Sequence, residues 1–149
     1  MSNDETLSGG CLCGRVRYSI AGPPRMVSHC HCGLCRRVSG AAFVTWLTAR
    51  RDTVSLSGNL VWYASSERGR RGFCPHCGSH VVSSSTDYDR YYDITAGSLD
   101  HPEAIRPQRH VFAHYQIGWL QLADDLPHHG EDGRSPVIGN RKKTMEDPS

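Results

Sequence analysis

Short stretches in which apolar and polar residues alternate follow one another along the chain. Val16, Tyr18 and Ile20 are separated by polar residues, and a similar two-residue period recurs in five further segments, at 43–46, 60–62, 81–82, 91–95 and 111–112. Side chains two apart share one face of a strand, so this period indicates strands with one buried face. Segments rich in turn-forming residues separate them, at 22–24, 57–59, 67–69, 83–85 and 97–98. The pattern is typical of antiparallel β structure.

Helical periodicity is weak throughout. Residues 32–38 are compatible with one short turn of helix, and residues 106–115 can be read as either helix or strand. No segment shows the sustained 3.6-residue period of a long amphipathic helix. The fold class predicted is therefore mostly β, with short antiparallel sheets and little helix.

A chain of 149 residues suits a single domain with a modest core. Residues 1–8 are polar, and the C-terminal twenty residues contain few apolar side chains among many charged and turn-forming ones. Such composition favours flexibility because little apolar surface can be buried. We therefore expect a flexible N-terminus at 1–8, one domain at 9–130, and a disordered tail at 131–149.

Composition narrows the classes of partner. Seventeen Lys and Arg residues nearly balance fifteen Asp and Glu residues, which gives a formal charge of +2. This balance provides no electrostatic reason to expect nucleic-acid binding. No segment approaches the roughly 20 apolar residues needed to span a bilayer, and the N-terminus lacks the basic and apolar regions of a signal peptide. We expect no membrane partner and a cytoplasmic location.

Seven cysteines provide the strongest chemical signal, and they occur in three tight clusters. They are Cys11 and Cys13, then Cys30, Cys32 and Cys35, then Cys74 and Cys77. An odd number does not fit a complete set of disulfides. Reduced thiolates that hold metal account for both the number and the spacing.

The spacing favours two zinc sites. Cys11 and Cys13 can share one face if their segment is extended, and Cys74 and Cys77 bracket a turn that Gly78 permits, as in a zinc knuckle. Four thiolates from these two pairs would close a tetrahedral structural site.

Cys30, Cys32 and Cys35 would then form a second site with three protein ligands and one open position, which is the arrangement of catalytic zinc. The residues alone leave alternatives open. Cys30, Cys32, Cys74 and Cys77 would form an equally valid tetrahedron. A nearby histidine could also close the three-cysteine site and make it structural, and the candidates are His29, His31, His76 and His80.

These clusters and their flanking residues resemble the glutathione-dependent formaldehyde-activating enzyme family, which also includes centromere protein V. The resemblance runs in order through residues 9–14, 29–37 with 39–40, 72–79, 96–100, 107–110, Trp119 and 125–127. It implies a β-tent fold with two zinc ions per chain. It assigns Cys11, Cys13, Cys74 and Cys77 to the structural zinc, and Cys30, Cys32 and Cys35 to the catalytic zinc.

The resemblance also implies an activity. The family reaction joins formaldehyde and glutathione into S-(hydroxymethyl)glutathione and is classed as a carbon-sulfur lyase reaction in reverse. The expected partner is thus a small thiol, with glutathione foremost, bound as thiolate at the open zinc position. A related enzyme could act on other thioether or halogenated compounds. The alternative from another class is a non-catalytic, zinc-stabilised binding module, as the centromere member suggests.

Overall fold

A computed structural model of the protein describes residues 4–139. Its chain forms two compact units, one built from residues up to 27 together with 46–106, and the other from residues 28–45 and those from 107 onward. Each unit is considered by itself below.

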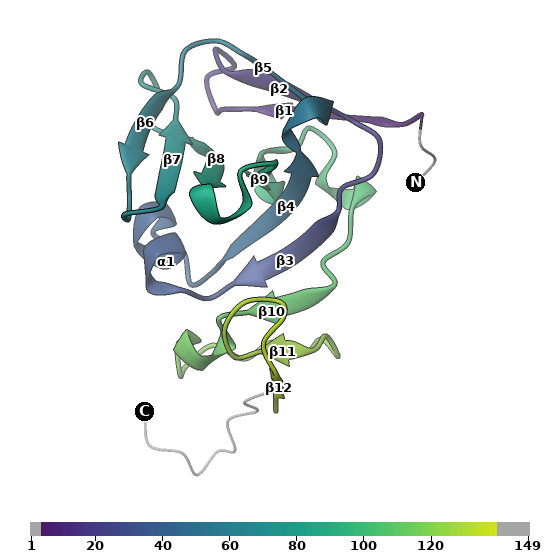
Figure 1. Cartoon of the computed structure of the whole chain (residues 1–149), viewed down its shortest axis with the longest axis vertical. Coiled ribbons are helices and arrows are strands. Elements are labelled where there is room, and N and C mark those ends of the chain that lie inside the picture. The colour runs from purple at the N-terminus through teal and green to yellow at the C-terminus, as the bar shows by residue number, and fades with distance from the viewer. Residues whose placement is uncertain (1–3, 140–149) are drawn as a thin grey trace. The chain divides into compact units, whose positions relative to one another are not determined.

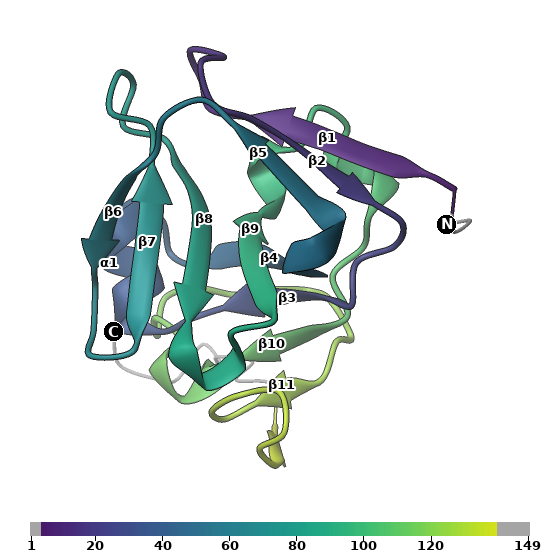
Figure 2. The same ribbon diagram turned by 45° about the horizontal axis from the view of Figure 1, so that its top comes forward.

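Two antiparallel β arrangements make up the first unit. The first has the strand order β1 (Thr6–Gly10), β2 (Arg17–Ala21) and β5 (Val54–Ser57). The second has the order β4 (Val44–Arg50), β9 (Tyr91–Thr95), β8 (His80–Ser85), β7 (Gly69–Phe73) and β6 (Val61–Ala64). Figures 1 and 2 both show β6, β7 and β8 side by side.

The core of the first unit is formed by the buried faces of these strands. The residues that contribute most are Leu7, Val16, Tyr18, Ile20, Leu47, Ala49, Val81, Val82, Ile94 and Leu99. Leu47 and Val82 both pair with Ile94, so these three central strands present an apolar row at this position. Burial of these side chains is the main source of its stability.

Glycine is required where β1 approaches β2. A Cβ atom at Gly9 would lie 2.3 Å from the Tyr18 hydroxyl oxygen and 2.4 Å from the Ser98 carbonyl oxygen. The Tyr18 hydroxyl also lies 2.8 Å from the Ser98 hydroxyl, and Gly9 forms a β-bridge with Leu99. This close packing fixes the chain just before Cys11.

The second unit combines short strands with one helix. Its strands include most of β3 (Met26–Cys30), β10 (Arg109–Val111), β11 (His128–His129) and β12 (Val137–Ile138). β10 pairs in parallel with both β3 and β11, whereas β11 and β12 are antiparallel. The α-helix α1 (Gly33–Ser39) begins after Cys32, whose sulfur accepts a hydrogen bond from the Cys35 amide, and ends at Gly40 in the left-handed conformation.

Short 3-10 turns connect many of these elements. They are η1 (Arg51–Thr53), η2 (Thr86–Tyr88), η3 (Ala96–Ser98), η4 (Pro102–Ala104) and η5 (Ala113–Tyr115).

The predicted fold class, mostly β with little helix, is confirmed. The helix lies within one residue of its expected place, and the strand at Tyr91–Thr95 has the expected bounds. Two details differ. The pairs that β10 makes with β3 and β11 are parallel, because a two-residue period does not encode strand direction. Residues 83–85 extend β8 and are not a turn, because they pair with Gly69–Arg71 of β7.

Two of the segments expected to lack structure contain strand residues. β1 begins at Thr6, inside the segment expected to be flexible, and β12 lies beyond residue 130. Residues 1–3 and 140–149 lie outside the described part of the chain. The domain limits 1–8, 9–130 and 131–149 therefore stay predictions. Within residues 4–139, no helix is long and apolar enough to cross a membrane.

Candidate metal centres

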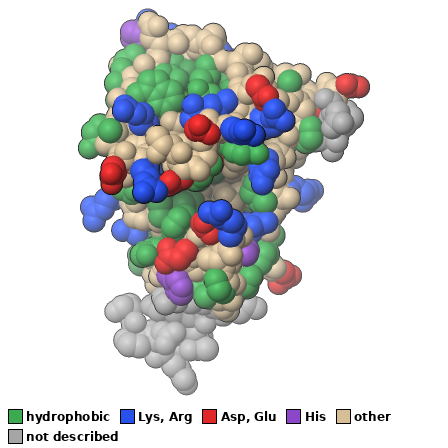
Figure 3. Space-filling model, viewed as in Figure 1, with side chains coloured by type: hydrophobic (Ala, Val, Ile, Leu, Met, Phe, Trp, Pro, Cys, Tyr) green, Lys and Arg blue, Asp and Glu red, His purple; other side chains and the backbone are tan. Residues whose placement is uncertain are grey.

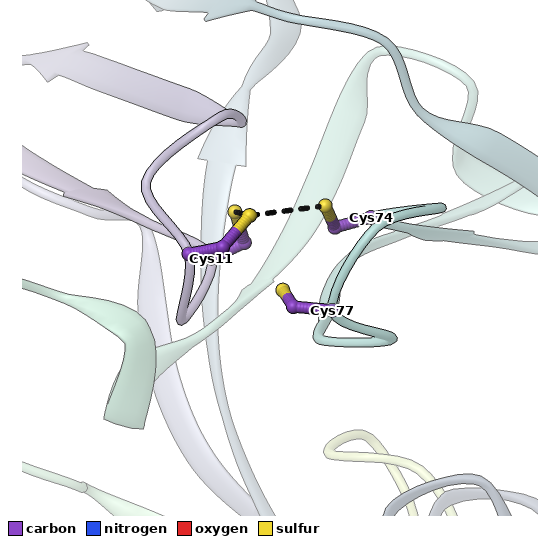
Figure 4. A group of neighbouring side chains, drawn as sticks. Cys11, Cys74 and Cys77 are labelled. Carbon is purple, nitrogen blue, oxygen red and sulfur yellow. Dashed lines mark hydrogen bonds between the residues drawn. The ribbon is translucent and has the colours of Figure 1, made fainter.

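Two loops of the first unit bring four cysteines together. Cys11 and Cys13 follow β1, and Cys74 and Cys77 follow β7. Their ligand atoms all lie within 4.8 Å of one another, and Figure 4 shows the sulfurs of Cys11, Cys74 and Cys77 pointing towards a common centre. All four cysteines are free thiols.

Sulfur spacing in this group matches a metal tetrahedron. Sγ of Cys13 lies 3.6 Å from Sγ of Cys11 and 3.7 Å from Sγ of Cys74. A tetrahedron with metal–sulfur bonds of about 2.3 Å has edges of about 3.8 Å. Two edges of the group therefore match a tetrahedral metal–thiolate site, and all four sulfurs lie close enough together to share one metal ion.

Backbone hydrogen bonds shape both loops around the sulfurs. The first is a turn, closed by bonds from Gly14 N to Cys11 O at 3.1 Å and from Cys11 N to Val16 O at 3.0 Å. The extended conformation considered for this segment is thus wrong, because these bonds bend the chain directly after β1. The turn still aims both sulfurs at one point, and Val16 N donates to Cys11 Sγ at 3.2 Å.

The second loop has the form expected of a zinc knuckle. Gly78 is left-handed, with φ 75°, and its amide donates to Cys74 O at 2.8 Å. The Ser79 hydroxyl lies 3.2 Å from Cys77 Sγ. Hydrogen bonds from the side chain and backbone of Ser79 lower the pKa of Cys77 to about 5, which favours the thiolate that binds metal.

The remaining three cysteines gather in the second unit. Cys30 ends β3, Cys32 caps α1, and Cys35 lies in the first turn of that helix. Their ligand atoms also lie within 4.8 Å of one another. The helix start draws Cys32 and Cys35 together, because the Cys35 amide donates to Cys32 Sγ at 3.3 Å.

Repulsion between the three thiolates favours a bound cation in the three-cysteine group. Cys30 and Cys35 are buried, and the sulfurs of Cys32 and Cys35 together with burial raise the pKa of Cys30. Three thiolates at this distance repel one another in a low dielectric, so they cannot all ionise alone. A divalent metal removes that repulsion and would leave a site with a formal charge of −1.

In the structure the seven cysteines form a group of four and a group of three. Cys74 and Cys77 group with Cys11 and Cys13, and not with Cys30 and Cys32. Among residues 4–139, no histidine, aspartate or glutamate joins the three-cysteine group. The group thus offers three donors, which is the number found in catalytic zinc sites with an open position.

The four histidines considered as a further ligand have other surroundings. The side chain of His29 contacts the Thr45 hydroxyl, and that of His31 contacts His110. Nε2 of His80 lies 3.2 Å from the Val82 carbonyl oxygen, and His76 is exposed. Burial is the main reason that the pKa values of His29, His31 and His80 are each lowered to about 4.

One further group was not predicted from the sequence. The ligand atoms of His29, His110 and Asp124 lie within 4.8 Å of one another in the second unit. Only His29 was considered for metal, and it was considered as a partner of the cysteines. The local sequence around His110 and Asp124 has no ligand spacing, so no motif could have found the group.

Comparisons with known proteins agree with this geometry. The sequence model of the family described as glutathione-dependent formaldehyde-activating enzyme matches residues 6–115. The chain is 31% identical over 88 residues to an uncharacterized lyase of Schizosaccharomyces pombe. That match covers 59% of this chain and 64% of the relative, so somewhat less than two thirds of the relative is represented.

A solved structure supports the fold. A crystal structure of a Rhodobacter sphaeroides protein superposes with a TM-score of 0.52 at 22% identity, over 67% of this chain and 91% of the other. The matched family segment contains all seven cysteines and spans well over half of the chain. The chain therefore belongs to the glutathione-dependent formaldehyde-activating enzyme family.

Proposed function

We propose that this protein is a zinc-dependent lyase that makes and breaks the carbon–sulfur bond of a small thiol adduct, with glutathione as the thiol and formaldehyde as the leading aldehyde. The observation that carries this proposal is the group of Cys30, Cys32 and Cys35, which offers three sulfur donors with no further histidine or carboxylate among the described residues. Membership of the family and the lyase among its relatives support the reaction class.

The three cysteines would hold the catalytic zinc, and when bound it would lower the pKa of a thiol so that the thiolate forms near neutral pH. Cys30 and Cys35 are anchored by β3 and α1, so the sulfurs stay in place during turnover. The net reaction forms a bond between the thiol sulfur and the aldehyde carbon, and the thiol proton ends on the new hydroxyl oxygen. The reverse reaction breaks the same bond and regenerates both compounds.

Cys11, Cys13, Cys74 and Cys77 would hold a second, structural zinc. With four donors the coordination is complete, so this site has no position for substrate. Its role would be to hold the loops after β1 and β7 together. The four-cysteine group would thus stabilise the fold, and the three-cysteine group would carry out the reaction.

The chemistry of the thiols bears on the location of the protein in the cell. The seven cysteines form no disulfide and lie at metal-ligand spacing, which suits a reducing environment, so we propose a cytoplasmic location. We also propose that the domain is a β-tent and acts on a small molecule. On the face shown in Figure 3, Lys and Arg side chains are scattered among Asp and Glu side chains. That face provides no continuous basic surface for nucleic acid.

The test is the rate of exchange between formaldehyde, glutathione and their adduct at equilibrium, followed by magnetisation-transfer NMR. Wild-type protein with two zinc ions should accelerate exchange, and Cys35→Ser should return it to the uncatalysed rate. Leu34→Ala is the matched control, because Leu34 is exposed and precedes Cys35 in the first turn of α1. It should keep full activity.

Two outcomes would overturn the proposal. A wild-type protein with both zinc ions and no effect on exchange would leave the non-catalytic binding module in its place. A Cys35→Ser protein that remains folded and retains full activity would exclude the three-cysteine group from the reaction. Circular dichroism and zinc content of each variant show whether the fold and the four-cysteine site persist.

A further inference from the structure

Three histidines of the second unit form one rung across three adjacent parallel strands. His110 of β10 pairs in register with His29 of β3 on one side and with His128 of β11 on the other. Residues in register on neighbouring strands present their side chains to the same face of the sheet. The rings accordingly lie 4.9 Å apart for His29 and His110, and 4.0 Å apart for His110 and His128.

A carboxylate completes this rung. Asp124 lies in the segment before β11, and its two oxygens are 3.1 Å and 3.0 Å from Nε2 of His110. Two of the three histidines, His29 and His110, and the carboxylate of Asp124 have ligand atoms that all lie within 4.8 Å of one another. A metal ion between them would replace the direct contact of His110 with Asp124.

Each of the three groups also has a hydrogen-bond partner outside the group. Nδ1 of His29 lies 2.8 Å from the Thr45 hydroxyl, and Nδ1 of His110 lies 2.8 Å from Nε2 of His31. The Leu126 amide donates to Oδ1 of Asp124 at 3.1 Å. These bonds leave Nε2 as the ligand atom of both rings. Metal-binding histidines in proteins typically have their other nitrogen held in this way.

The group of His29, His110 and Asp124 is buried on the side of the histidines and partly exposed to solvent on the side of Asp124. His110 and His128 are buried, and the ring of Phe43 packs against His29 and His31 at 5.0 Å and 5.2 Å. Nε2 of His128 and Nδ1 of His31 are buried without a hydrogen-bond partner. Buried polar atoms without a partner are rare in folded proteins, and a bound ion or water is one explanation for them. A third atom of this kind, Nδ1 of His80, lies in the first unit. Asp124 remains partly exposed, so an ion could enter from its side.

We propose that His29, His110 and Asp124 form a third metal site, for a divalent first-row transition metal ion, separate from both cysteine groups. Two imidazole nitrogens and one carboxylate suit zinc, iron, nickel or copper better than magnesium or calcium, which prefer oxygen ligands alone. The ion would link β3, β10 and the segment before β11, elements that are otherwise joined by pairings of only one to three residues. This site does not depend on the proposed lyase activity.

The test is a cobalt titration of the full chain loaded beforehand with two equivalents of zinc, which fill the cysteine sites and leave none for a third site, and it is followed by visible absorption and by elemental analysis. Wild type should bind one further Co²⁺ per chain, with d–d absorption and without thiolate-to-cobalt charge transfer. Asp124→Asn should weaken this binding by more than the roughly 10- to 100-fold typical of outer-sphere substitutions. Thr45→Val, which removes such an outer partner, should weaken it by about 10- to 100-fold.

Asp125→Asn is the matched control, because it makes the same change of charge at the next residue, which is exposed. It should bind cobalt as wild type does. The proposal is overturned if wild type binds no further ion, if Asp124→Asn binds as tightly as Asp125→Asn, or if charge-transfer bands show that cobalt has entered a cysteine site. Should Asp124→Asn fail to fold, His29→Gln decides, since His29 is only half-buried, and unchanged binding there also overturns the proposal.

Discussion

The hydroxyl of Ser79 lies 3.2 Å from the sulfur of Cys77 and accepts a hydrogen bond from the Leu12 amide at 3.0 Å. A hydroxyl can accept one hydrogen bond and donate another at the same time, and a thiolate can only accept, so Ser79 donates to the Cys77 sulfur when that sulfur is ionised. Ser79 therefore joins the two loops of the four-cysteine group and stabilises the charged form of one ligand.

Ser79→Ala should weaken metal binding at the four-cysteine group by about 10- to 100-fold, because the thiolate loses its donor and Leu12 loses its acceptor. Competition with a chromophoric chelator measures this affinity. Ser55→Ala, an exposed serine on β5, is the control and should leave the affinity unchanged. Equal affinities in both variants would mean that Ser79 does not support the site.

Gly78→Ala should destabilise the metal-loaded protein by about 1–2 kcal/mol, the cost of a left-handed conformation for a residue with a Cβ. Gly78 has φ 75°, and a Cβ there would meet nothing within 4 Å, so strain is the only cost. Gly97→Ala is the matched control, because it also faces open space but is not left-handed. Urea denaturation of both variants measures the difference, and an equal loss in both would contradict this account.

The cysteine groups could be predicted because their spacing is local. The pairs 11 and 13, and 74 and 77, each lie within one tight turn, and helix α1 brings Cys32 and Cys35 together over three residues. Such short spacings leave the sulfurs near one another in almost any fold. Family resemblance then decided between two possible pairings that the spacing alone left open.

The rung of His29, His110 and His128 could not be predicted in this way. It depends on parallel pairing between strands of only two to five residues, and one of these pairings is defined by a single pair, His110 with His128. Strands this short have almost no periodic signal in the sequence. The serines of β8 were misread for a related reason, since their pairing with Gly69–Arg71 overrides their local preference for turns.

Cys13→Ser should destabilise the protein more than Cys35→Ser, although Cys13 is exposed and Cys35 is buried. Loss of one ligand from the closed group should release the metal that holds its two loops, with a cost of about 4 kcal/mol or more. Thermal unfolding of the zinc-loaded variants, with zinc content measured in parallel, tests this order. Packing alone predicts the opposite order, so a larger loss in Cys35→Ser would argue against a structural metal in the first unit.

His80→Gln should make the protein less sensitive to acid. Burial, and then the charge of Arg71, lower the pKa of His80 to about 4 in the folded state, below its ordinary value of 6.5. Both states are neutral at this residue above pH 6.5. Between about pH 6.5 and 4 the unfolded chain binds a proton that the folded chain does not, so the free energy of unfolding falls as the pH falls.

One pKa unit corresponds to about 1.4 kcal/mol, and allowing for the partial exposure of His80 we expect a loss of about 1–2 kcal/mol over this range. Urea denaturation at pH 7 and pH 5 should show that wild type loses more stability than His80→Gln. Acid also releases metal from thiolates, but this affects both proteins and cancels in their difference. His101→Gln, which changes an exposed histidine, should follow wild type. If His80→Gln also follows wild type, the histidine does not contribute to acid sensitivity, and loss of metal alone accounts for it.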